Sequence, residues 1–186
     1  VVTSCTVCKV VTSTKTISRI KTVKLSATSY TYNGKSKKPS VTVKDYKGKT
    51  LKKGTDYTVS YKNNKKVGKA TVTITFKGKY SGSKKLTFTI KPKTTTLSKL
   101  TAGKKQLKVT WKKNSAVSGY QIQYSTSKKF TSPKTVTVKG YKTTSKTIKN
   151  LKAKKTYYVR VRTYKTVNGK KVYSDWSKKV LSKKTK

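Results

Sequence analysis

Histidine, glutamate and methionine are absent from this chain of 186 residues, and aspartate occurs only at Asp45, Asp56 and Asp175. Histidine and glutamate are among the side chains that most often transfer protons in enzymes. Without histidine there is no Ser–His–Asp triad, and three scattered aspartates do not suggest a catalytic carboxylate pair. The glycine-rich phosphate-binding patterns are missing as well. We therefore expect a protein that is not an enzyme and that uses no cofactor.

Cysteine is scarce too, and it occurs only at Cys5 and Cys8. Two cysteines without histidine cannot complete a tetrahedral metal site, so we expect no bound metal. Their C-x-x-C spacing makes them a candidate disulfide, within one chain or between two. A redox-active pair needs a thioredoxin-like strand–helix setting, which the surrounding sequence lacks. The alternative is a tail in which they are simply two small apolar residues.

Long apolar runs are missing. No segment approaches the roughly 18 apolar residues of a membrane helix, and residues 1–8 lack the basic and apolar regions of a signal peptide. We expect no membrane span.

Negatively charged residues are nearly absent, whereas positively charged residues are abundant. The chain has 49 Lys and Arg against 3 Asp and Glu, a net charge of +46. Arginine occurs only at Arg19, Arg160 and Arg162, so almost all of this charge is lysine. The lysine ammonium group is a hydrated point charge, whereas the arginine guanidinium group binds phosphate through two parallel hydrogen bonds. A lysine coat favours diffuse, salt-sensitive binding to anionic polymers such as teichoic acid, acidic glycans or extracellular DNA. The alternative is a surface tuned only for solubility.

Apolar residues recur with period two, which is the spacing of a half-buried β-strand, and no window shows helical spacing. In the first half the pattern covers 41–43, 57–61, 70–76 and 86–90, and the last two segments are expected to form a hairpin. Lysine and threonine fill the alternate positions, so each strand has a buried face and a cationic face. The stretch 92–96 breaks the pattern and is expected to be a linker.

The alternation resumes in the second half at 107–111, 120–124, 136–138 and 157–161. Asn168 and Gly169 predict a tight hairpin turn. About seven short strands with turns at this spacing predict a β-sandwich. The sequence therefore predicts an all-β chain.

Several strings in the second half resemble a known family. Residues 107–111 and 119–124 resemble strands B and C of a fibronectin type III domain. Residues 151–162 resemble its E–F corner and strand F, which would make Tyr157 the tyrosine-corner residue. Residues 173–177 resemble the start of strand G, and the resemblance covers roughly 97–184.

The first half resembles bacterial immunoglobulin-like repeats, on the strings 25–35, 38–41 and 51–61. The combination is similar to Lys- and Thr-rich segments of secreted surface proteins of Gram-positive, clostridia-like bacteria. It implies two tandem β-sandwiches, an immunoglobulin-like domain at 25–91 and a fibronectin type III-like domain at 97–186. It also implies an extracellular location at the cell wall or cell surface. Neither family has a fixed active site, so no functional residue follows from the resemblance.

The most distinctive local pattern lies in the strand expected around 157–164. If Tyr157, Val159 and Val161 face the core, the alternate side chains share the outer face. We call these side chains the predicted ladder: Tyr158, Arg160, Arg162 and Tyr164. They are a candidate site for sugar stacking or phosphate contact. The alternative is ordinary cross-strand pairing on an exposed sheet face.

Residues 1–24 are β-prone and precede the first recognisable module. This predicted N-terminal arm either completes the first domain or adds as a strand to a neighbouring subunit. In the second case the chain would be a fibre subunit, with Cys5 and Cys8 able to lock it covalently. The three aspartates all lie near turns or strand ends, where turn and ion-pair roles are expected.

The sequence thus favours a non-enzymatic, extracellular structural or adhesive protein whose lysine surface binds anionic envelope or matrix polymers. A self-assembling filament joined by its N-terminal arm is the alternative. Nucleic-acid binding comes third, because arginine is scarce and no known nucleic-acid motif is present.

Overall fold

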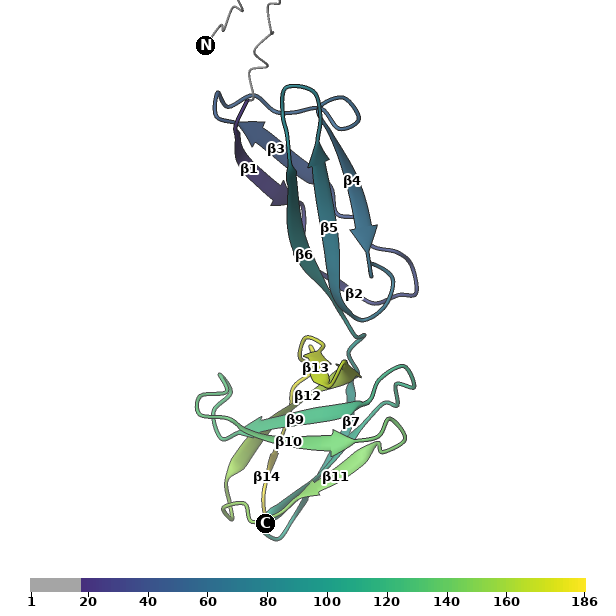
Figure 1. The fold of residues 1–186 in the computed structure, drawn as a ribbon. Coiled ribbons are helices and arrows are strands. Elements are labelled where there is room, and N and C mark those ends of the chain that lie inside the picture. The colour runs from purple at the N-terminus through teal and green to yellow at the C-terminus, as the bar shows by residue number, and fades with distance from the viewer. Residues whose placement is uncertain (1–17) are drawn as a thin grey trace, which may run out of the picture. The chain divides into compact units, whose positions relative to one another are not determined.

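The computed structural model describes residues 18–186, and every regular element in this range is a β-strand (Figure 1). This confirms the predicted all-β fold. The strands are β1 (Ile20–Leu25), β2 (Ser29–Thr31), β3 (Val41–Asp45), β4 (Tyr57–Lys62), β5 (Gly68–Phe76), β6 (Ser83–Lys91), β7 (Leu97–Gly103), β8 (Gln106–Trp111), β9 (Gly119–Ser125), β10 (Lys134–Lys139), β11 (Ser145–Ile148), β12 (Thr156–Val167), β13 (Lys170–Tyr173) and β14 (Leu181–Lys184).

The chain divides into two compact units that are not continuous in sequence. Of the described residues, the first unit holds 18–28, 37–64 and 69–88, and the second holds 29–36, 65–68 and 89–186. The predicted boundaries of the two sequence modules, at 25–91 and 97–186 with the linker 92–96 between them, stay predictions. We describe each unit by itself.

Two sheets enclose the core of the first unit (Figure 1). One sheet is the antiparallel pair β1–β3, and the other has the order β2-β6-β5-β4. The last residues of β6 run on into the second unit, where they pair in parallel with β2. The alternation read from the sequence places Val43 of one sheet and Val72, Ile74 and Phe88 of the other in the interior, each at most 2% exposed.

Part of the predicted N-terminal arm belongs to the first unit. Residues 20–25 are strand β1, and this strand pairs antiparallel with β3. The predicted boundary at residue 24 therefore falls inside a strand, because backbone pairing to β3 makes 20–24 part of the sheet. A bulge between Ile20 and Thr22 puts Ile20 and Val23 on the same side of the strand. The rest of the arm, including Cys5 and Cys8, lies outside the described residues.

Asp45 ends β3 as a buried turn residue, 6% exposed. Its Oδ1 accepts hydrogen bonds from the backbone N–H groups of Lys47 and Lys49, each at 3.0 Å. Its Oδ2 accepts one from the hydroxyl of Tyr80, also at 3.0 Å. The expected turn role of this aspartate is confirmed, and its carboxylate is fully used inside the fold.

We expect the first unit to lose stability in acid because of Asp45. Burial by itself raises the pKa of this carboxyl, but the hydrogen bonds from Tyr80 and two backbone amides, with the charge of Lys79, outweigh burial and lower it. A carboxyl with a lowered pKa in the folded state stabilises that state above its ordinary pKa of about 4. This contribution is lost as the pH falls through the folded value, so the melting temperature of the first unit should drop below about pH 4.

Circular dichroism melts over a range of pH measure this effect. Both tryptophans, Trp111 and Trp176, lie in the second unit, so a transition without a change in tryptophan fluorescence reports the first unit. Asp45→Asn should flatten the acid dependence of that transition. Asp175→Asn removes the same charge from the second unit and is the matched control, which should leave it unchanged. An Asp45→Asn protein with the acid dependence of the original chain would contradict the assignment.

The second unit also contains two sheets (Figure 1). One has the order β11-β8-β7, and the other has the order β10-β9-β12-β13, with β14 also pairing with β12. The alternating apolar residues of β8, β9 and β12 meet between the sheets. The largest of these, Trp111 and Tyr120, are at most 2% exposed, with ring centroids 5.2 Å apart. This is the predicted sandwich.

The predicted hairpin turn and the expected tyrosine corner are both present in the second unit. Asn168 and Gly169, with φ of 48° and 74°, connect β12 to β13 as a two-residue hairpin turn. Tyr157 is buried, and its hydroxyl oxygen accepts a hydrogen bond of 3.1 Å from the backbone N–H of Lys152. This contact is that of a tyrosine corner, the role expected of Tyr157.

Candidate functional site

Strand β12 separates its side chains as the alternation predicts. Val159 and Val161 are fully buried and Tyr157 nearly so, whereas Arg160 and Arg162 are half-buried on the opposite face. The binding of a ligand at these residues stays a prediction. The structure adds which side chains surround the two arginines.

Both guanidinium groups pack against aromatic rings. The Arg160 Cζ lies 4.1 Å from the ring centroid of Phe130 and 4.9 Å from that of Trp176. The Arg162 Cζ lies 4.0 Å from the ring centroid of Tyr173 and 4.3 Å from that of Trp176. Trp176 is therefore shared by the two cations. We call this group the Arg–aromatic stack, and its members are Phe130, Arg160, Trp176, Arg162 and Tyr173.

Strand β9 holds the arginines from the side. Gln123 is paired with Arg160 and Gln121 with Arg162 in the register of β9 and β12. The Nε of Arg160 donates to Gln123 Oε1 at 2.7 Å, and the Nε of Arg162 donates to Gln121 Oε1 at 2.8 Å. These bonds restrict the rotation of each guanidinium group, which also packs against two rings.

Two serines bring Trp176 to this face. Residues 174–180 form no strand, although 173–177 resemble the start of a last strand, which begins only at Leu181. Ser174 and Ser177 are buried, and their backbone N–H groups donate to the carbonyls of Thr163 and Val161 in β12. In return, the N–H groups of Thr163 and Val161 donate to the serine hydroxyls, at 3.0 and 3.2 Å. The serine side chains thus complete pairing along β12 and anchor both sides of Trp176.

The two tyrosines of the predicted ladder behave differently from the arginines. Tyr164 lies in the same alternation but is only 3% exposed, so it is not an accessible part of a binding face. Its ring lies 6.0 Å from that of Tyr173, and Lys171 Nζ lies 5.2 Å from its centroid. Tyr158 is half-buried, and within residues 18–186 it makes no ring contact with either arginine.

Sequence reasoning missed the three aromatic members of the stack. Tyr173 could have been found, because a two-residue turn at 168–169 places residue 173 opposite residue 164, as the structure shows. No comparable signal points to Phe130 or Trp176. They lie outside the strands and reach the arginines only through the tertiary fold.

The electrostatics of this face are cationic and largely uncompensated. Desolvation by burial lowers the pKa of both arginines, yet a guanidinium remains protonated at physiological pH. In the part of the chain that the structure describes, the single salt bridge joins Lys91 Nζ to Asp175 Oδ1 at 2.7 Å, which confirms an ion-pair role for Asp175. Asp56 accepts a hydrogen bond from the backbone N–H of Lys52, again as a turn residue. Within residues 18–186, no hydrogen bond or salt bridge joins an aspartate side chain to Arg160 or Arg162.

The lysines form a coat. No lysine within 18–186 is buried, and all of them are exposed except the half-buried Lys37, Lys91 and Lys165. Three aspartates against 49 Lys and Arg cancel little of this charge, which leaves a net charge of +46.

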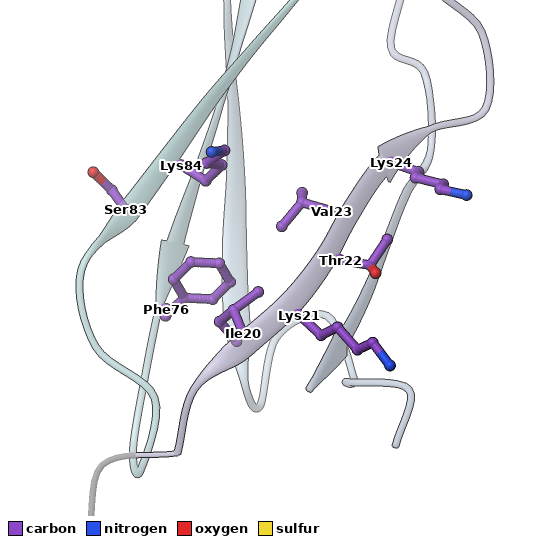
Figure 2. A pocket seen from close by; sticks show the side chains of 8 residues that line it. All are labelled: Ile20, Lys21, Thr22, Val23, Lys24, Phe76, Ser83 and Lys84. Atoms are coloured by element: carbon purple, nitrogen blue, oxygen red, sulfur yellow. The ribbon is translucent and has the colours of Figure 1, made fainter. Parts of the chain in front are cut away.

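The first unit carries a hollow of about 380 Å³ at its edge, between β1 and strands β5 and β6. Figure 2 shows Ile20 and Val23 projecting from β1 toward the side of Phe76, while Lys21 and Lys24 project the other way. Lysine, serine and threonine are its polar lining. It contains no carboxylate and so offers no acid–base pair.

Two further findings concern residues 18–186 only. They include no group of three or more histidine, cysteine, aspartate or glutamate side chains that could hold a metal ion. They also include no helix whose length and apolar character would let it cross a membrane.

The sandwich, the tyrosine corner and the stacked face of β12 all lie within one stretch of the chain. Residues 91–180 match the fibronectin type III domain. This confirms the family resemblance of the second half. The match does not extend to the first half, where the likeness to bacterial immunoglobulin-like repeats stays a prediction, as does the clostridial origin.

Three solved structures are similar to this chain at low identity. A segment of two fibronectin type III domains from chicken tenascin is 16% identical, with a TM-score of 0.48, over 89% of this chain and 99% of that one. A β-1,2-glucanase from Parabacteroides distasonis is 16% identical, with a TM-score of 0.41, over 62% of this chain and 17% of that one. A structure described as a myokine is 20% identical, with a TM-score of 0.37, over 49% of this chain and 90% of that one. At identities and TM-scores this low, the similarities say nothing about function.

A search of curated proteins finds no match to this chain. Fibronectin type III domains are in general non-catalytic structural or adhesive modules and are typically extracellular. The fibronectin type III domain of this chain therefore provides the framework, and its surface has to account for any specific partner.

Proposed function

We propose that this chain is an extracellular structural or adhesive module at the cell surface, whose lysine coat binds anionic polymers of the envelope or matrix. The observation that carries the proposal is the exposure of the lysines on a chain of net charge +46 with three locally engaged aspartates. At physiological salt, charges interact over about 8 Å, so neighbouring lysines act together on a polymer lying along the surface.

Binding by a lysine coat releases counterions and is therefore sensitive to salt. We expect affinity for teichoic acid, dextran sulfate and double-stranded DNA to fall at least tenfold between about 50 and about 200 mM salt. Neutral dextran should not bind at either concentration. The measurement is a titration of each polymer at several salt concentrations, with the slope of log affinity against log salt as the readout. A slope near zero would contradict the proposal.

Chemical modification offers a matched control. Reductive methylation keeps the positive charge of lysine, whereas acetylation removes it. The methylated protein should bind with the original salt slope, and the acetylated protein should lose binding. Tryptophan fluorescence and circular dichroism establish that each modified protein is folded. Undiminished binding by the acetylated, folded protein would overturn the role of the lysines.

The alternative function is a self-assembling filament whose subunits are joined by the N-terminal arm. In the structure, the segment 20–24 of this arm pairs with β3 of its own chain. Strand addition by the residues before it stays a prediction, as do homo-oligomers and the locking role of Cys5 and Cys8. Light scattering with and without a reductant tests it.

A further inference from the structure

The free part of each stacked arginine is its outer edge. Rings lie against the guanidinium groups of Arg160 and Arg162, and a glutamine of β9 accepts from each Nε. Within residues 18–186, the terminal amino groups of these arginines have no hydrogen-bond partner. These groups also reach solvent, because the one buried side-chain nitrogen without a partner in this range is Nε1 of Trp111.

The neighbouring rings limit what kind of ligand fits. A sugar ring or a base would have to stack on a guanidinium group, and each group already packs against two of the rings of Phe130, Trp176 and Tyr173. The edge that carries the two terminal amino groups remains, and it matches two oxygens of a tetrahedral oxoanion. Alternate residues of a strand are about 7 Å apart, so two such edges stand side by side.

We propose that the terminal amino groups of Arg160 and Arg162 form a discrete site for phosphate or sulfate groups, one held by each arginine. The glutamines and rings hold both forks in place before binding, so little side-chain entropy is lost when an anion arrives. No carboxylate of the described chain competes for these forks, since the salt bridge of this range lies between Lys91 and Asp175. The site gives the polymer a fixed point of attachment within the diffuse attraction of the proposed lysine coat.

Nuclear magnetic resonance can observe this site residue by residue. The chain has three arginines and two tryptophans, so the arginine Nε–H and indole N–H signals are few enough to assign. The probe is inorganic pyrophosphate, titrated at constant ionic strength with sodium chloride as the reference. The signals of Arg160, Arg162 and Trp176 should shift and saturate. Arg19, which is exposed and outside the stack, and the buried Trp111 are internal controls that should hardly move.

Two substitutions that keep the net charge test whether the paired terminal amino groups of the arginines bind the anion. Arg160→Lys with Arg162→Lys keeps the net charge but removes the paired amino groups, and pyrophosphate affinity should fall about tenfold or more. Arg19→Lys is the matched control and should not change it. If the double variant does not fold, the titration of the original chain still decides the matter. Shifts of Arg160 and Arg162 no larger than that of Arg19 would overturn the proposal.

Two competitors identify the source of the anion. A short glycerol phosphate oligomer and a sulfated disaccharide are each added to the pyrophosphate-bound protein. Displacement at the lower concentration by the first points to a phosphate polymer, and by the second to a sulfated glycan, and either supports the site. Displacement by neither would contradict it. The lysine coat is tested separately, because acetylation leaves both arginines intact and their substitution leaves every lysine intact.

Discussion

Replacing Gly119 with alanine is expected to lower the free energy of unfolding of the fibronectin type III domain by about 3 kcal/mol. A Cβ at this position would lie 2.3 Å from the backbone carbonyl oxygen of Val138 and 2.7 Å from the hydroxyl oxygen of Tyr164. Neither neighbour can move easily. The carbonyl belongs to β10, which pairs with β9 along its whole length, and Tyr164 is buried over the glycine.

Gly103→Ala is the matched control for this substitution. Neither glycine has a positive φ, so an alanine strains neither backbone. At Gly103 the new Cβ would meet the side chain of Gln106 at 2.9 Å, and that flexible side chain can move aside. Chemical denaturation followed by tryptophan fluorescence measures both variants, because both tryptophans lie in this domain. If Gly119→Ala cost no more than the control, the close packing of Tyr164 over β9 would be disproved.

Replacing Trp176 with alanine is expected to destabilise the same domain by about 3 kcal/mol. The substitution removes the ring that both Arg160 and Arg162 contact, at 4.9 and 4.3 Å from the ring centroid. It also leaves two positive charges close together on β12 without the ring that they share. The fluorescence of the remaining Trp111, which is buried in the core, follows unfolding of the variant.

Two further variants distinguish the contribution of the cation–aromatic contacts from that of the apolar area of the Trp176 ring. Trp176→Leu keeps an apolar side chain but loses the π-system, so it should recover only part of the stability. Tyr141→Ala removes an exposed aromatic ring from the same domain and should change stability by less than about 0.5 kcal/mol. Equal stability of Trp176→Leu and the original chain would show that the cation–aromatic contacts contribute nothing, and that the ring acts only through its apolar area.

Local pattern was enough for much of the fibronectin type III domain. The alternation of 107–111, 120–124 and 157–161 predicted β8, β9 and the core side of β12, because one buried face imposes period two on each strand. The Asn168-Gly169 turn was also predicted correctly, since it depends on contacts within a few residues. The corner role of Tyr157 came from the resemblance to the fibronectin type III family, and its hydrogen bond with Lys152 confirms it.

The sequence predicted less about the N-terminal part of the first unit. The sequence left open whether the predicted N-terminal arm, residues 1–24, completes the first domain or adds to a neighbouring subunit. The structure shows that its residues 20–24 pair with β3, and strand pairing between segments about 20 residues apart is not visible in a local pattern.

The face of β12 that carries Arg160 and Arg162 shows most clearly what the sequence determined and what the tertiary structure decided. Composition alone determined that this protein is a polycation with almost no acidic groups, and alternation alone determined that Arg160 and Arg162 share one side of a strand. Tertiary structure decided that Tyr164 is buried and that Phe130, Tyr173 and Trp176 pack against the arginines. The physical reason is that alternation fixes only the direction of a side chain. Its exposure and its partners depend on neighbouring strands and on loops distant in sequence, which meet only when the sandwich closes.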